Sequence, residues 1–174
     1  MAQEFYATVA QASFTLLGLW WVLLQIRYEA WFADVDYRRA VYDISLYFLL
    51  PGMMGLGALL AAQEPTIWRG VFAVLGAVGV VESALVVGGM RVLRAWPALV
   101  AVADWGSLVA YALLVAVALS PQLPRDVGLG LRPLEAEGML VAILLMLGIT
   151  LACALFVTTG PGAEPSAARR ERAD

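Results

Sequence analysis

The chain has 174 residues, of which 62% are hydrophobic and 14% are charged. In soluble proteins about a quarter of all residues are charged, so this composition excludes an ordinary soluble domain and indicates a membrane protein. The net charge is −3, and all eleven cations are Arg residues spread along the chain, which excludes a nucleic-acid-binding face.

Histidine is absent, and Cys153 is the single cysteine. The commonest transition-metal ligand and general base is therefore missing, and no intramolecular disulfide can form. The sequence also lacks nucleotide-binding and catalytic motifs. We therefore expect no cofactor, no metal site and no enzymatic activity.

Five apolar blocks of about 20 residues each are long enough to cross the roughly 30 Å hydrocarbon core of a bilayer as helices. The predicted fold is therefore all-α, an integral membrane bundle of five transmembrane helices that forms one domain over residues 1–158. No basic residue precedes Arg27, so the first block lacks the features of a cleaved signal and is expected to remain as a span. The polar tail, residues 159–174, is expected to be disordered. The predicted spans are residues 5–26, 41–62, 67–90, 97–119 and 139–157.

The first span carries a polar stripe at three- and four-residue spacing, which places its members on one helical face. We expect this face to look into the bundle. Two interpretations remain open: hydrogen bonding and close packing between helices, or the lining of a pore. The stripe consists of Gln11, Thr15, Gly18 and Gln25, with Val22 in the same register.

The first span also contains FYATVAQAS at residues 5–13 and TLLGL at residues 15–19. Together with residues 42–52, these segments resemble a family of small, uncharacterised multi-span bacterial membrane proteins. The resemblance covers about the first third of the chain. It implies a multi-span membrane fold, and it implies no particular catalytic or binding residue.

Residues 27–43 mix charges of both signs with aromatic side chains, which is typical of a short helix at the membrane interface. The second span is then interrupted by Pro51 and Gly52. Proline removes a backbone hydrogen bond and clashes with the preceding turn, so we expect a kink or a broken helix near Leu50. A break could form part of a transport site, whereas a kink would be structural.

The third and fourth spans each contain one carboxylic acid, Glu82 and Asp104. An ionisable group inside a membrane span is costly and therefore marks a candidate functional site. Counting from the nearest helix ends places both acids roughly 10–12 Å below the interface, within about a turn of Gly18, Pro51 and Thr150. We interpret Glu82, Asp104 and Thr150 as a candidate cation or proton site. The alternative is that the two acids are neutral and fix helix packing through hydrogen bonds.

Orientation follows from the distribution of Arg residues near the helix ends. Eight lie in the first connection, the third connection and the tail, whereas three lie on the opposite side. The positive-inside rule therefore places the N-terminus outside and the C-terminus in the cytoplasm. Residues 120–138 form the longest connection between spans, and their Pro and Gly residues predict an irregular loop.

The function that these patterns favour is a small oligomeric channel or transporter with a buried acidic site. An alternative is a non-catalytic accessory or regulatory membrane subunit, in which residues 27–43 and the basic tail contact another protein or anionic lipid. A membrane enzyme that uses paired carboxyl groups is a third reading, although no such local motif is found. The expected partners are the lipid bilayer and a second copy or another membrane protein. The excess of Ala, Val, Gly and Arg is typical of a bacterial protein, here of the inner membrane.

Overall fold

The computed structural model describes residues 2–32, 34–61, 64–86, 91–93, 95–128 and 130–158. These residues form helices and short turns and contain no strand. Five of the helices are long and apolar enough to cross a membrane, which confirms an all-α chain with five candidate spans. The elements are α1 (Ala2–Phe32), α2 (Val35–Leu60), α3 (Pro65–Val86), η1 (Arg91–Leu93), α4 (Pro97–Leu119), α5 (Leu123–Asp126) and α6 (Pro133–Thr158).

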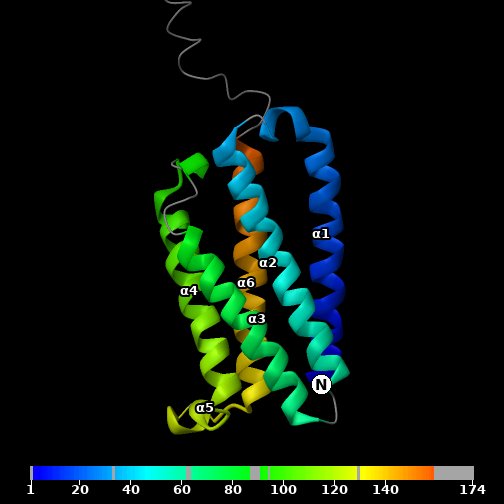
Figure 1. Ribbon diagram of the computed structural model, residues 1–174, viewed down its shortest axis with the longest axis vertical. Coiled ribbons are helices and arrows are strands. Elements are labelled where there is room, and N and C mark those ends of the chain that lie inside the picture. The colour runs from blue at the N-terminus through cyan, green and yellow to red at the C-terminus, as the bar shows by residue number, and fades with distance from the viewer. Residues whose placement is uncertain are drawn as a thin grey trace, which may run out of the picture.

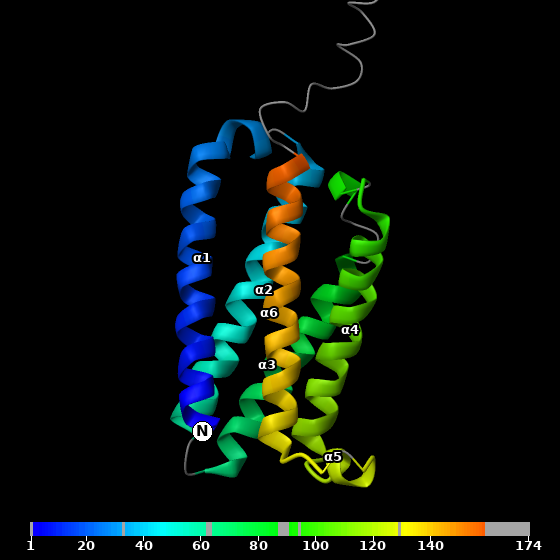
Figure 2. The ribbon, with the colours of Figure 1, turned by 180° about the vertical axis from the view of Figure 1, so that it is seen from behind.

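The long helices stand side by side as a bundle, with α1 at one edge and α4 at the other (Figure 1). Helix α2 packs against α1, α3 and α6, and α6 packs against α1, α2 and α4. The view from behind shows α6 in front of α2 and α3, between α1 and α4 (Figure 2). Helices α2 and α6 therefore form the centre of the bundle, and α1 covers one side of it.

The two ends of the bundle are different. The N-terminal end contains the starts of α1, α3 and α6 and the ends of α2 and α4, with α5 lying across it (Figure 1). The C-terminal end contains the ends of α1, α3 and α6, the starts of α2 and α4, and η1. Because successive long helices run in opposite directions, residues far apart in the sequence lie together at each end of the bundle.

The separate interfacial helix expected within residues 27–43 is not found in the part of this segment that the structure describes. Helix α1 instead continues to Phe32, and α2 begins at Val35. The carboxylate of Asp34 caps the start of α2 by accepting a 2.8 Å hydrogen bond from the backbone N–H of Asp36. An N-cap of this kind satisfies a backbone donor that the helix leaves unpaired. The charged residues of this segment therefore lie at the end of α1 and at the start of α2.

The prediction of an irregular loop over residues 120–138 is also partly wrong. Helix α5 occupies Leu123–Asp126, and α6 already begins at Pro133. Proline is well suited to the first turn of a helix, where its missing N–H would have no partner in any case. Gly128 and Gly130, between these two helices, have positive φ angles of 78° and 63°, which glycine adopts without strain. As a result, α6 starts before the span predicted at residues 139–157.

Helix α2 passes through Pro51 without a break, so a broken helix near Leu50 is excluded. The neighbouring Gly52 has a packing role: a Cβ at this position would lie 3.1 Å from atoms of Ser13 and Phe14 on α1. The Pro51–Gly52 pair is buried. It therefore allows α1 to approach α2 closely.

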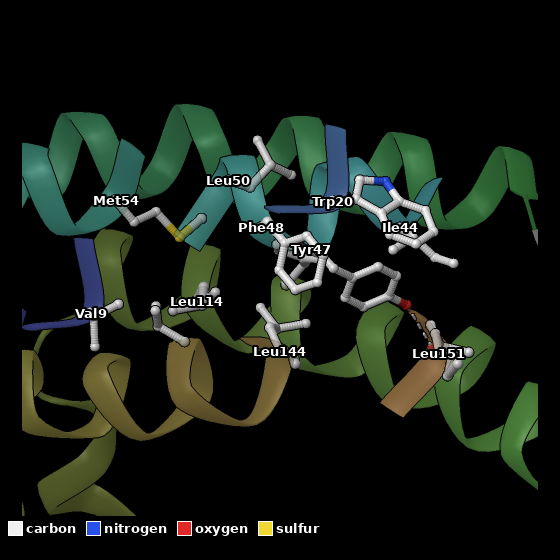
Figure 3. Close-up of a cluster of buried hydrophobic side chains, with 14 of the residues drawn as sticks. Val9, Trp20, Ile44, Tyr47, Phe48, Leu50, Met54, Leu114, Leu144 and Leu151 are labelled. Carbon is white, nitrogen blue, oxygen red and sulfur yellow. Dashed lines mark hydrogen bonds between the residues drawn. The ribbon is translucent and has the colours of Figure 1, made fainter. Parts of the chain in front are cut away.

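The core is formed mainly by α2 together with the facing sides of α4 and α6. Figure 3 shows Tyr47 and Phe48 of α2 beside Leu144 of α6, with Leu114 of α4 nearby. A Cβ added at Gly148 would lie 2.6 Å from the Cβ of Tyr47, so α2 and α6 pack almost backbone to backbone. Small residues that permit close approach are typical of helix contacts inside membranes.

Candidate functional site

The acid at the centre of the candidate site is Asp43 of α2, which the sequence reasoning had assigned to the interfacial stretch. Its side chain is 7% exposed. Its carboxyl group lies within electrostatic range of Asp104 on α4 and, more weakly, of Glu82 on α3. Three helices therefore bring one carboxyl group each to the C-terminal end of the bundle. We call Asp43, Glu82 and Asp104 the acidic layer.

Asp43 could have been found by the rule that identified the other two acids. It lies between Val41 and Ile44, inside the second apolar block. Several charged residues precede Asp43, the last of them Arg39, so its position in the sequence is also typical of the end of a solvent-exposed segment. Because α2 begins as early as Val35, Asp43 lies about two turns inside the helix.

Glu82 lies at the outer edge of the acidic layer. Its Oε1 atom accepts a long hydrogen bond of 3.5 Å from the hydroxyl of Tyr42. Glu82 is half-buried and Tyr42 is exposed. Glu82 is therefore more accessible from the surface than Asp43, which is the most enclosed member of the layer.

Hydroxyl groups surround the inner side of the acidic layer. The hydroxyl of Tyr47 donates to the backbone oxygen of Ala103 at 3.3 Å (dashed in Figure 3). Ser107 donates to the backbone oxygen of Asp104, also at 3.3 Å, and lies within hydrogen-bonding reach of Tyr47. The buried side chain of Tyr111 lies near both Tyr47 and Asp43. The layer is thus a cluster of carboxyl and hydroxyl groups inside the bundle.

Thr150 does not join this cluster. Its side chain is exposed, and its hydroxyl donates to the backbone oxygen of Met146 in its own helix at 2.8 Å. The inward face of α6 is formed by Val141, Leu144, Gly148 and Leu151. Thr150 lies near the predicted depth, close in sequence to Gly148, but it points out of the bundle. Within one chain, the structure therefore does not bring Thr150 together with Glu82 and Asp104.

The polar stripe of α1 also points outward, contrary to the inward orientation expected from its composition. Gln11, Thr15, Gly18 and Gln25 are all exposed. Apart from its chain neighbours and the nearby backbone of its own helix, no atom lies within 4 Å of where a Cβ of Gly18 would be. The opposite face of α1 packs instead, and it contributes Tyr6, Val9, Ala10, Ser13, Trp20 and Leu24 to the core. Within one chain, the stripe lines neither a pore nor a helix contact.

A further buried acid, Glu137, was missed because it fell within the predicted loop. It lies in the first turns of α6 and is fully buried. Neither carboxyl oxygen has a hydrogen-bond partner among the described residues. Glu137 lies on the same helical face as Val141, Leu144 and Gly148, at spacings of four, three and four residues. With a helix that begins at Pro133, this periodicity places Glu137 on the buried face.

The groups around Glu137 form hydrogen bonds elsewhere. The hydroxyl of Tyr6 lies within electrostatic range of Glu137 but donates to the backbone oxygen of Leu134 at 2.6 Å. Arg69 is also within electrostatic range, yet it donates to the backbone oxygens of Ala118 at 2.8 Å and Leu119 at 3.0 Å. These two carbonyl groups belong to the last turn of α4, whose backbone acceptors have no partner within the helix. The guanidinium group of Arg69 therefore holds the end of α4 in place.

The described residues contain no group of three or more His, Cys, Asp or Glu side chains that could together hold a metal ion. Cys153 is exposed on α6. The acidic layer consists of three neighbouring carboxyl groups with hydroxyl groups beside them.

Comparison with other proteins adds no assignment, because no family model, no curated protein and no solved structure matches this chain. The fold defines the class of the protein as an all-α bundle with five helices long and apolar enough to span a membrane. Any functional conclusion therefore rests on the residues themselves.

Proposed function

We propose that the protein spans a bacterial inner membrane with its N-terminus outside and its C-terminus in the cytoplasm. The five long apolar helices support insertion. The larger number of Arg residues in the first and third connections and the tail supports this orientation. On this proposal the acidic layer lies toward the cytoplasmic side, and Glu137 lies toward the outer side.

We further propose that the protein is a small transporter or channel for protons or small cations. The observation that carries this proposal is the nearly complete burial of Asp43 beside the carboxyl groups of Asp104 and Glu82. Like charges at close range in a low dielectric repel each other strongly, so such a group must share protons or hold a cation. Acidic side chains within membrane spans are typical of ion pathways and proton relays.

Two further features support proton transfer. The hydroxyl groups of Tyr47, Ser107 and Tyr111 can each donate and accept a hydrogen bond, as a relay next to Asp43 requires. Glu137 provides an acid at the opposite end of the bundle, where its two oxygens lack partners among the described residues. A carboxyl group buried in this way is costly as an unpaired charge, so it holds a proton or binds a cation.

The test is proton and cation flux in proteoliposomes that contain the full chain. We expect Asp43→Asn to lower flux by about a hundredfold or more, the typical contribution of a positioned proton-transferring group. The double variant Glu82→Gln, Asp104→Asn should also lose flux. Asp126→Asn is the matched control, because it removes the same charge from an exposed position on α5. This variant should transport like the wild type.

Helix content and thermal unfolding in detergent should be compared for all variants, so that loss of flux is separated from loss of folding. Wild-type vesicles that conduct no more than empty vesicles would overturn the proposal. Folded Asp43→Asn protein with wild-type flux would overturn the role of the acidic layer.

A further inference from the structure

The outward face of α1 has a second regularity besides its polarity. Its members alternate between spacings of four and three residues over two full heptads. A repeat of 3.5 residues keeps one side of a helix facing a single partner helix along its length. We call Gln11, Thr15, Gly18, Val22 and Gln25 the α1 seam.

The α1 seam is fully available to a partner. All five residues are exposed. Helix α1 packs against α2 and α6 through its other face, so a partner on the seam would not displace any contact within the chain. At the middle of the seam, Gly18 has open space around it, which would let a second helix approach closely. The flanking side chains Leu19, Trp21 and Ile26 are 63%, 58% and 73% exposed and are apolar.

A polar seam cannot be satisfied by lipid. Hydrocarbon chains offer neither donors nor acceptors, and a primary amide without a hydrogen bond is costly in an apolar medium. Glutamine and threonine side chains each contain both a donor and an acceptor. The seam is therefore complementary to itself, because the same seam on a second copy supplies the hydrogen-bond donors and acceptors that lipid chains do not contain.

We propose that the α1 seam binds the α1 seam of a second copy of this chain, forming a parallel two-fold dimer. Two copies inserted in the same direction bring each residue of the seam against its own counterpart, Gln11 against Gln11 and Gln25 against Gln25. Gly18 lies midway between the two glutamines and forms the point of closest approach. This interface does not depend on the proposed transport function, since the acidic layer lies on other helices.

The test is disulfide cross-linking in membranes that contain the full chain. Cys153 is first replaced by Ala, and single cysteines are then introduced along α1. Disulfides require short distances between Cα atoms, so only residues at the contact should react efficiently. We expect cross-linked dimer for Thr15→Cys, Gly18→Cys and Val22→Cys at severalfold higher yield than for Leu19→Cys, Trp21→Cys and Ile26→Cys. All six positions are exposed in the single chain, which makes the second set a matched control.

A second measurement uses the dissociation constant of the dimer in detergent. Gln11→Leu and Gln25→Leu should each weaken association about three- to tenfold, as expected for one hydrogen-bonded pair between membrane helices. Gly18→Leu should weaken it further by preventing close approach. Gly70→Leu is the control, because Gly70 on α3 is also exposed with no atom within 4 Å of its Cβ position.

Equal cross-linking at all exposed positions would indicate random collision and would overturn the dimer. Cross-linking that is strongest at Leu19 or Ile26 would also overturn it, as would a chain that stays monomeric in both membranes and detergent. Capture of a different protein at the seam, with no cross-link between copies, would assign the surface to another partner and contradict the proposal.

Discussion

The two ends of the bundle each bury carboxyl groups, but they surround them differently. At the C-terminal end, Asp43 lies among other acids and hydroxyl groups. At the N-terminal end, Glu137 lies near Arg69 and the hydroxyl of Tyr6 but forms no hydrogen bond among the described residues. The cation does not pair with the acid, because its hydrogen bonds go to the end of α4.

The comparison shows that burial alone does not define the role of an acid. Asp43 has neighbours that can share a proton with it, so the acidic layer is suited to exchange. Glu137 has the hydroxyl of Tyr6 near it, but that hydroxyl donates to the backbone oxygen of Leu134. The carboxyl group of Glu137 therefore has no hydrogen bond among the described residues and is a cost to folding. Proteins commonly retain a destabilising group at a functional site, so the buried carboxyl group of Glu137 is consistent with a functional role.

The largest effect on stability is expected from Arg69→Met. This change removes two hydrogen bonds from a charged donor to the backbone oxygens of Ala118 and Leu119. Because hydrogen bonds to charged groups contribute about 1.5–3 kcal/mol each when buried, and this side chain is partly exposed, we expect a loss of about 2–3 kcal/mol in the free energy of unfolding. Thermal unfolding in detergent measures it. Arg125→Met, at an exposed position on α5, is the control. Equal stability of the two variants would show that Arg69 does not fasten α4.

A smaller effect of opposite sign is expected from Glu137→Leu. The change replaces an unpaired buried carboxyl group with an apolar side chain of similar size, so the free energy of unfolding should rise by about 1–2 kcal/mol. The same variant should lose flux. A clear loss of stability would mean that the carboxyl group holds the bundle together, and Glu137 would then be a structural acid. Glu64→Leu serves as the control at an exposed position.

The sequence was sufficient to predict the helices because their length and hydrophobicity are decisive. The fourth span, residues 97–119, has the same bounds as α4. The ends of the other helices were less accurate. Helix α2 extends beyond the apolar block to include charged residues such as Asp36 and Arg38. Helix α6 begins at Pro133, inside a segment whose composition is typical of a loop.

The direction in which side chains point was harder to predict. The α1 seam and Thr150 were placed inside the bundle on the assumption that polar groups avoid the outside. In helices that are apolar on nearly every side, the packed face is selected by shape instead, through small residues such as Gly52 and Gly148. Hydropathy does not contain that information. Glu137 lies outside the predicted fifth span because α6 begins earlier than composition indicates, whereas Asp43 lies inside the predicted second span but directly follows a charged stretch.

The central claim is that the acidic layer exchanges protons or cations. Infrared absorption of carboxyl groups tests it most directly, using the reconstituted full chain in H₂O and D₂O over a range of pH. The account predicts a carboxylic-acid C=O band that responds to pH, shifts in D₂O, and is lost in Asp43→Asn. A C=O band whose intensity and frequency change neither with pH nor in D₂O, or that is unchanged in Asp43→Asn, would contradict the claim.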